Sequence, residues 1–386
     1  MNKRKQTFAK AAPSLIAVII GLLVAVVVIF ITKPENGLEA TIRFFKGPFN
    51  RGLVGFGDWF YYITPILMTG LSVGFAYQTG LFNIGASGQF LMGGFLAILV
   101  SVKLKGVIPQ NILWIVAMLA AAIGGGILAA IVGALKAYRN VNEVITNIML
   151  NYTSLYLVND FIKRFGIYNQ LQNNTIGIAT KIPRLGMDTL FPGTISGGGF
   201  FIALGFVALT WIILKKTTFG FELKGVGLNR HAARYAGVNE NRSIVLSMTI
   251  AGVLAGLAGS MLYLSGAGNH ISVHEVIPAE GFDGIAIALL GLNEPIGILL
   301  SAALIAYLRM GGQAIQALGY APELITMIIS FILYVSALSV LFRNILSKRT
   351  KVDESENINK PDDILDPVNV NAPRIDQTDS DKEGGN

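Results

Sequence analysis

The sequence has 386 residues, of which 53% are hydrophobic and 14% are charged, and its mean hydropathy is +0.58. Apolar runs of about 20 residues, the length that crosses a bilayer, recur along the chain, which excludes a soluble domain and indicates an all-α polytopic membrane protein. The absence of cysteine excludes disulfides, thiolate metal ligands and cysteine nucleophiles. The net charge of +7 requires no nucleic-acid partner, because lysine and arginine are expected in cytoplasmic loops.

Ten segments are expected to cross the lipid bilayer as helices, which makes residues 13–345 a transmembrane domain. The first follows the basic residues 1–12 and exceeds the length of a signal-peptide core, so it is interpreted as an anchor. The stretch 282–310 is too long for one pass and is divided at Asn293-Glu294-Pro295. The predicted spans are 13–32, 59–79, 82–102, 110–135, 144–162, 199–214, 244–266, 282–292, 295–310 and 322–342.

An even number of spans places both termini on one side of the membrane. The segments then assigned to the cytoplasm hold more Lys and Arg than those assigned to the outside, which is the expected bias. Residues 1–12 and 346–386 are therefore predicted to be cytoplasmic. The second of these segments is acidic, polar and poor in aromatic residues, which predicts a disordered tail.

The second to fifth spans and the seventh to tenth spans form two sets of four that begin from opposite sides of the membrane. This pattern predicts an inverted repeat, a common transporter architecture with the substrate path between the halves. The glycine-rich stretch 80–94 and the break at 293–295 interrupt the two halves at early positions. Interrupted hydrophobic segments are where such proteins build binding sites.

The sequence LFNIGASGQFLMGG at 81–94 places Ser87 in a setting that intramembrane serine proteases use for their nucleophile. That chemistry requires a histidine within hydrogen-bond reach of the serine. The chain has only His231, His270 and His274, and none of them lies within a predicted span. A protease is therefore the remote alternative, and no catalytic residue is assigned.

His270, His274 and Glu275 also suggest a metal site, because two histidines four residues apart share one face of a helix. Proline follows at the position where a zinc-protease helix would carry its second histidine, and Gly266 and Gly268 favour a loop. These residues are interpreted as surface residues, and no metal is expected. No phosphate-binding Gly-x-x-x-x-Gly-Lys-Ser/Thr motif occurs, so ATP and Mg would have to be bound by another chain.

Several carboxamide side chains lie inside predicted spans. Asn147 and Asn151 are four residues apart, which places them on one face of a helix. A carboxamide cannot face lipid without losing its hydrogen-bond partners, so this face must meet protein or a wet cavity. For these two residues, as for Asn83 and Gln89, a substrate pathway and interhelical hydrogen bonding both stay open. Asp283 is a further pathway candidate or the cap of a helix.

The loop 215–243 is too polar to span the membrane and too patterned to be a slack linker. Asn229 is able to cap a short helix in which Ala232, Ala233 and Ala236 provide small side chains. Such a helix is suited to press into a groove on a partner protein. The candidate docking residues are Asn229, Arg230, His231, Ala232, Ala233, Arg234 and Gly237.

Residues 231–237 resemble the Glu-Ala-Ala-x-x-x-Gly coupling motif of bacterial ABC importer permeases, with His231 in place of the glutamate and Ser247 in place of a later proline. Five blocks together resemble the permeases of nucleoside importers that work with basic-membrane-protein-type lipoproteins, within the branched-chain amino acid, ribose and nucleoside permease class. The similarity extends from about residue 10 to residue 345. The blocks are TGLFNIGASGQFLMGG, NVNEVITNIMLNY, TTFGFELKGVGLNRHAARYAGV, AGVLAGLAGS and GFDGIAIALLG.

The resemblance implies a non-catalytic transport subunit that pairs with a second permease, two ATPase domains and a lipoprotein that delivers a nucleoside. A ribose-type simple sugar is the alternative substrate. A secondary transporter is a further alternative, but it requires ionisable groups deep in the bundle, and Asp283 and Glu294 both lie near breaks.

Overall fold

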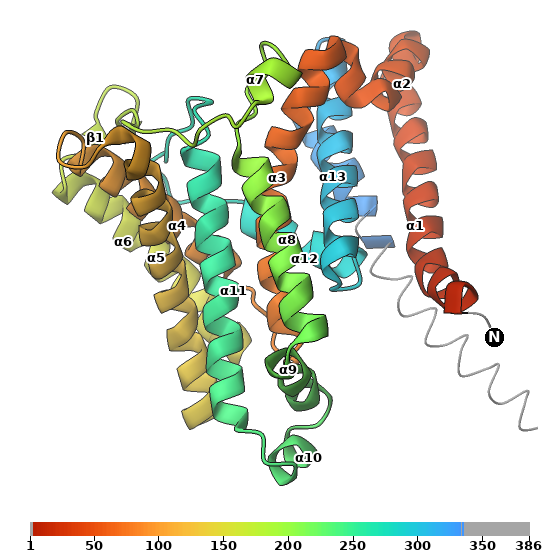
Figure 1. The fold of residues 1–386 in the computed structure, drawn as a ribbon. Helices are drawn as coiled ribbons and strands as arrows, with labels where there is room; N and C mark the ends of the chain where they lie inside the picture. The colour runs from red at the N-terminus through yellow and green to blue at the C-terminus, as the bar shows by residue number, and fades with distance from the viewer. Residues whose placement is uncertain (1–2, 333, 336–386) are drawn as a thin grey trace, which may run out of the picture. The chain divides into compact units, whose positions relative to one another are not determined.

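The computed structural model describes residues 3–332 together with 334 and 335 (Figure 1). This part of the chain is mostly helical, as predicted, and its antiparallel hairpin joins β1 (Tyr168–Asn169) to β2 (Asn174–Thr175). The predicted acidic tail lies outside the described residues, as does the end of the last predicted span. The helices are α1 (Lys3–Thr32), η1 (Pro34–Asn36), α2 (Gly37–Lys46), η2 (Gly47–Arg51), α3 (Gly52–Tyr77), α4 (Ala86–Lys103), α5 (Gln110–Arg139), α6 (Glu143–Arg164), α7 (Met187–Leu190), α8 (Gly199–Lys216), α9 (Thr218–Leu228), α10 (Arg230–Tyr235), α11 (Glu240–Tyr263), α12 (Glu280–Leu290) and α13 (Pro295–Gln316).

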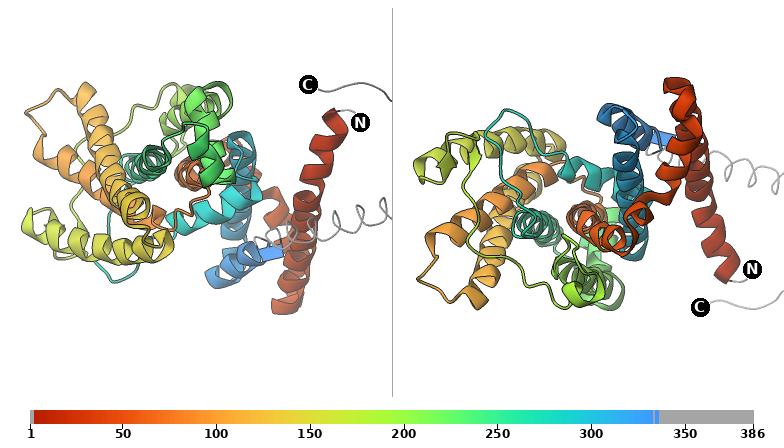
Figure 2. Two further views of the ribbon diagram at one scale, coloured as in Figure 1. Left: turned by 90° about the horizontal axis from the view of Figure 1, so that it is seen from below. Right: turned by 90° about the horizontal axis from the view of Figure 1, so that it is seen from above.

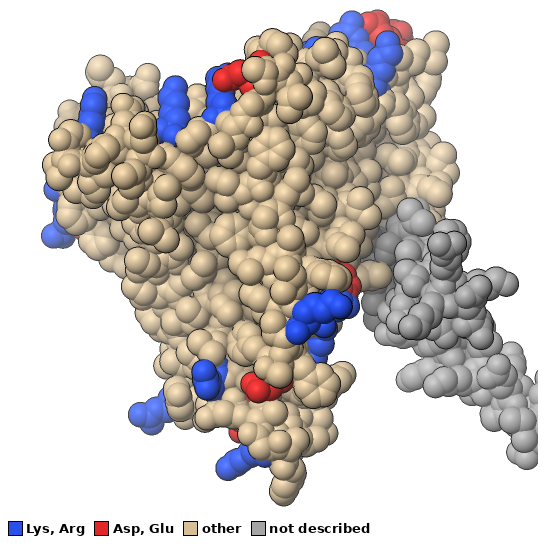
Figure 3. Space-filling model, viewed as in Figure 1, with Lys and Arg blue, Asp and Glu red and all other residues tan. Residues whose placement is uncertain are grey.

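Six helical stretches in the described part of the chain are long and apolar enough to cross a membrane. The other four predicted spans also lie in helices, namely α1, α6, α12 and a helix over 322–332. Figure 3 shows charged side chains toward the two ends of one face, with uncharged surface between them. The six stretches are Pro34–Tyr77, Ala86–Lys103, Gln110–Arg139, Gly199–Lys216, Glu240–Tyr263 and Pro295–Gln316.

Segment 33–58, assigned to an outside loop by the sequence, is almost entirely helical. The amphipathic helix α2 buries Ala40 and Phe44 while Arg43 and Lys46 remain at its surface. The sequence did not predict α2, because its mixture of apolar and charged residues is too polar for a span and too short for a clear helical pattern.

Glycines bring α4, α5 and α11 into backbone contact at the centre of the bundle. A Cβ atom added to Gly93 would lie 2.4 Å from the Cα of Gly256, and one added to Gly252 would lie 2.3 Å from the carbonyl oxygen of Gly125. Such approaches permit no side chain, and small residues are how membrane helices pack without a hydrophobic driving force. Gly252 and Gly256 of α11 therefore serve close helix packing.

Two pairs of helices repeat the same arrangement around the centre. The long helices α3 and α11 pack side by side, α4 packs on α11, and α12 packs on α3. Both views in Figure 2 place α6 and the segment 322–335 on one side of the bundle, with α12 between them. This side therefore carries α6, which follows the stretch 80–94 in the sequence, and the segment 322–332, which follows the break at 293–295.

Candidate functional site

The chain between α3 and α4 is a break in which eight residues, 78–85, leave the helix. Gly80 takes a left-handed φ of 71°, and a Cβ atom added there would lie 3.4 Å from the carbonyl oxygen of Gly227 in α9. The predicted span 82–102 therefore begins as a helix only at Ala86, because the positive φ at Gly80 ends the regular backbone. The break carries backbone groups that need partners away from water.

Two predicted pathway residues, Asn83 and Gln89, pair with each other beside this break. The Asn83 Nδ2 donates to Gln89 Oε1 at 2.9 Å, and the Gln89 Nε2 donates to Asn83 Oδ1 at 3.0 Å. Asn83 Nδ2 also lies 3.1 Å from the hydroxyl of Ser72 in α3. The pair thus connects α3, the break and the first turns of α4.

The other two predicted carboxamides reach the break from α6. Asn147 Nδ2 donates to the Phe82 carbonyl at 3.3 Å, and Asn151 Nδ2 donates to the Ile84 carbonyl at 3.0 Å. Asn151 Oδ1 accepts from the backbone N–H of Gly88 at 2.8 Å. The predicted common face is confirmed, and both side chains hydrogen-bond to backbone groups of the break, while Asn151 also reaches the first turn of α4.

Glycines make this contact possible. A Cβ atom added to Gly85 would lie 2.2 Å from Asn147 Oδ1, and one added to Gly88 would lie 2.7 Å from Asn151 Oδ1. All four carboxamide residues are buried. This network of Asn83, Gln89, Asn147 and Asn151 ties the break to α3, α4 and α6.

Ser87 lies in the first turn of α4, where it meets the first turn of α12. It is fully buried, and a Cβ atom added to Gly281 would lie 2.3 Å from its backbone nitrogen and 2.3 Å from its hydroxyl oxygen. Within the described part of the chain, that hydroxyl has no hydrogen-bond partner. Ser87 is therefore a close-packed contact between the first turns of α4 and α12.

Asp283, in the first turn of α12, forms an ion pair with Arg309 of α13 through its Oδ2 atom. It does not cap its helix by a side-chain hydrogen bond. The predicted span 295–310 ends one residue after Arg309, whereas α13 continues to Gln316. The pairing joins residues 26 positions apart, which no local pattern could reveal.

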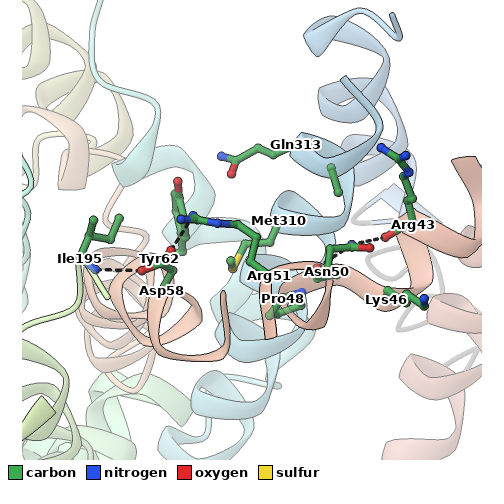
Figure 4. Close-up of a pocket in the computed structure, with 12 residues that line it drawn as sticks. Arg43, Lys46, Pro48, Asn50, Arg51, Asp58, Tyr62, Ile195, Met310 and Gln313 are labelled. Carbon is green, nitrogen blue, oxygen red and sulfur yellow. Dashed lines mark hydrogen bonds and ion pairs between the residues drawn. The ribbon is translucent and has the colours of Figure 1, made fainter. Parts of the chain in front are cut away.

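A second carboxylate, Asp58, lies near the start of α3 beside a cavity of about 570 Å³ (Figure 4). Arg51 Nη1 lies 2.8 Å from its Oδ2. Its Oδ1 accepts from the Thr194 hydroxyl and from the Ile195 N–H, both at 2.9 Å. These partners compensate the burial of the charge, and the site ties α3 to the 191–198 segment.

The loop predicted to dock a partner forms α9 and α10, and α10 lies at the lower extreme of the fold in Figure 1. Asn229 caps α10 as predicted, because its side chain accepts from the Ala232 N–H at 3.1 Å. Gly237 has a φ of 84°, a conformation that favours glycine after a helix. Arg230 is held 3.7 Å from Glu240 at the start of α11.

Ala232, Ala233 and Ala236, which were predicted to provide small side chains for docking, do not lie on one surface. Ala232 and Ala236 are exposed, but Ala233 is buried against the protein's own core, because a helix turns by about 100° per residue. His231 and Arg234 are exposed. Tyr235, at the end of α10, is 93% exposed and was not among the predicted docking residues.

A small apolar cluster joins this loop to the break. Val226 of α9 and Ala233 of α10 are in one buried cluster with Ala76 and Leu81, which flank residues 78–80. The Thr79 and Ser247 hydroxyls are 2.8 Å apart. A displacement of α9 and α10 would therefore act directly on the break.

The two remaining histidines lie in the loop between α11 and α12, as predicted. His270 Nδ1 is 2.9 Å from the Thr175 carbonyl oxygen, and His274 Nδ1 accepts from the Val276 N–H at 3.3 Å. Gly266 and Gly268 both have a positive φ, as a loop requires. Among the described residues, no group of three or more His, Cys, Asp or Glu side chains could hold a metal ion.

A bundle of apolar helices with polar breaks at its centre is the architecture of a membrane transport protein. A family model described as the permease component of branched-chain amino acid transport systems matches residues 55–338, and the chain belongs to this family. The resemblance found in the sequence is thereby confirmed.

Three curated relatives illustrate the family. The chain is 35% identical to the guanosine ABC transporter permease protein NupP of Bacillus subtilis, over 87% of this chain and 96% of the relative. It is 34% identical to the nucleoside ABC transporter permease protein NupB of Lactococcus lactis subsp. cremoris, over 77% and 82% of the two chains. It is 29% identical to the glucose ABC transporter permease protein TsgB13 of Haloferax volcanii, over 72% and 75%.

Proposed function

We propose that this chain is a permease subunit of an ABC importer that carries nucleosides across a bacterial plasma membrane. The observation that carries the proposal is the 35% identity to a guanosine permease over 87% of this chain. ATP and Mg belong to a separate ATPase chain, a second homologous permease completes the membrane unit, and a lipoprotein delivers the nucleoside from outside. This subunit itself has no catalytic role.

The transmembrane unit has ten spans arranged as an inverted repeat. The reciprocal packing of α4 on α11 and α12 on α3 supports this, because exchanging α3 with α11 and α4 with α12 reproduces the arrangement. In Figure 1, α3 descends and α11 ascends, as inverted copies must. The N-terminal end of α1 and helix α10 both point to the lower side, which is the cytoplasmic side.

The ATPase docks on the exposed side of α10, formed by His231, Ala232, Arg234 and Tyr235. ATP binding moves this helix, and the apolar cluster that Val226 and Ala233 form with Leu81 passes the movement to the break. The carboxamide network resists the movement until α6 and α4 separate. Alternation between closed and open states of the break then moves the substrate.

Uptake by the reconstituted importer tests the function. Proteoliposomes that contain both permeases, the ATPase and the lipoprotein should accumulate radiolabelled guanosine in an ATP-dependent, vanadate-sensitive manner. Omission of this chain should abolish uptake. ATP-dependent glucose uptake without guanosine uptake would replace the proposal with the simple-sugar alternative, for which the 29% identity to a glucose permease is the supporting observation.

The absence of native cysteine makes the orientation directly testable. Tyr235→Cys should react with an impermeant maleimide only from the cytoplasmic side. Leu171→Cys, at a residue that is 98% exposed in the β1–β2 turn, should react only from the outside. The reverse pattern would contradict the proposed topology.

A further inference from the structure

A second cavity, of about 280 Å³, lies beside the Asp283–Arg309 ion pair. Its polar lining comes from α3, α12, α13 and the helix that begins at 322. The volume is close to the lower end of the range for small-molecule sites, about 300 Å³. The lining includes Tyr62, Asp283, Arg309, Gln313, Thr326 and Ser330.

The cavity wall carries polar groups at helical spacing. Arg309 and Gln313 are one turn apart on α13, and Thr326 and Ser330 are one turn apart on the next helix. Gln313, Thr326 and Ser330 are exposed in the single chain. Polar side chains of a transmembrane bundle avoid lipid, so this wall faces water or another protein.

The cavity also connects two features of the structure. Tyr62 and Gln313 line both this cavity and the larger one beside Asp58, so the polar lining is continuous between the two cavities. At the other end, Asp283 is two residues from Gly281, which contacts Ser87 at the start of α4. The first turn of α12 therefore contributes both to the cavity, through Asp283, and to the contact with α4, through Gly281.

We propose that this cavity is a nucleoside-binding site on the import path, an inference that rests on the proposed function. A carboxylate accepts hydrogen bonds from ribose hydroxyls, as acidic residues do in dinucleotide-binding folds. An amide donates and accepts at once, which matches the edge of a purine base. Asp283 therefore binds the ribose, Gln313 binds the base edge, and the ring of Tyr62 provides a stacking face.

The ion pair leaves Asp283 able to do this. Within the described part of the chain, Arg309 contacts Oδ2 of the carboxylate, and Oδ1 accepts no hydrogen bond from another residue. The side chains of Arg309 and Asp283 are 30% and 20% exposed, so the pair borders the cavity rather than lying sealed behind it. Arg309 orients the Asp283 carboxylate.

The test compares uptake of guanosine and 2′-deoxyguanosine by the complete importer, with a lipoprotein supplied at saturating concentration. Because the lipoprotein is the same in every sample, a change in the ratio of the two uptake rates reports on this chain. Asp283→Asn should lower the preference for guanosine on the order of tenfold, the value of one hydrogen bond to a charged group. Gln313→Leu should raise the KM for both substrates by a similar factor.

Gln172→Leu is the matched control, because Gln172 is an exposed glutamine in the β1–β2 turn. It should leave the ratio and the KM unchanged. If Asp283→Asn fails to assemble, Gln313→Leu decides, since this residue is exposed and its replacement breaks no ion pair. Wild-type values in both variants, with guanosine still imported, would overturn the site but not the proposed function. A wild-type complex that imports no nucleoside would overturn both.

Discussion

Two polar sites in the bundle differ in their chemistry. At the break 78–85, buried, neutral carboxamides from α6 donate to backbone carbonyl groups. At the first turn of α12 the polar groups are an aspartate and an arginine, which border a cavity. Hydrogen-bonded neutral amides cost less to bury than charges do. The carboxamide network is therefore suited to lock the break, and the Asp283–Arg309 pair is suited to contact a polar molecule.

The largest effect is expected from overfilling the first break. Gly88→Val would drive a side chain into Asn151, whose Oδ1 lies 2.7 Å from the added Cβ position. Overpacking of this kind costs about 3 kcal/mol. The purified protein should unfold at a clearly lower temperature and lose uptake. Gly205→Val in α8 is the control, because no atom lies within 4 Å of the added Cβ position there.

Asn151→Leu tests whether the carboxamide network holds the break, with a side chain that has the same number of non-hydrogen atoms. The substitution removes the hydrogen bonds to Ile84 and Gly88 and leaves both backbone groups unsatisfied. The expected loss of stability is about 2 kcal/mol. Thermal unfolding in detergent measures it, with Met149→Leu on the exposed side of α6 as the comparison. Equal unfolding temperatures for the two variants would show that the network does not hold the break.

Arg309→Gln tests the Asp283–Arg309 site. The ion pair is partly exposed, so its loss should reduce the free energy of unfolding by only about 1 kcal/mol. Guanosine uptake should nevertheless fall clearly, because Asp283 loses its orienting partner at the path. A variant as unstable as Asn151→Leu would mean that the two sites do not differ in the way described.

The smallest effect is expected at the turn that follows α12. Lys215 of α8 lies 2.7 Å from Glu294, and the two side chains are 37% and 45% exposed. An exposed pair of this kind contributes less than about 0.5 kcal/mol. Lys215→Ala should therefore change neither the unfolding temperature nor uptake measurably.

The sequence predicted the helical segments well because apolar runs and their interruptions are local features. It also placed Asn147 and Asn151 on one face, since helical spacing depends on sequence alone. It could not predict that this face meets the carbonyl groups of Phe82 and Ile84, because that contact arises from tertiary packing.

Two further features had no local signal. The Asp283–Arg309 ion pair joins α12 to α13 across 26 positions, a pairing that no local pattern reveals. The buried position of Ala233 depends on its contact with α9, whereas the pattern of small residues showed only that α10 could pack closely. Tyr235 carries no motif and becomes notable only through its exposure.

The central claim is that α10 receives the force of the ATPase, and a charge at its most exposed aromatic residue tests it directly. Tyr235→Asp should abolish co-purification of the ATPase and reduce guanosine uptake at least about tenfold, since aromatic anchors contribute 2 kcal/mol or more at interfaces. Tyr138→Asp, at a residue that is 67% exposed near the end of α5, should retain both. Wild-type uptake by Tyr235→Asp would contradict the account.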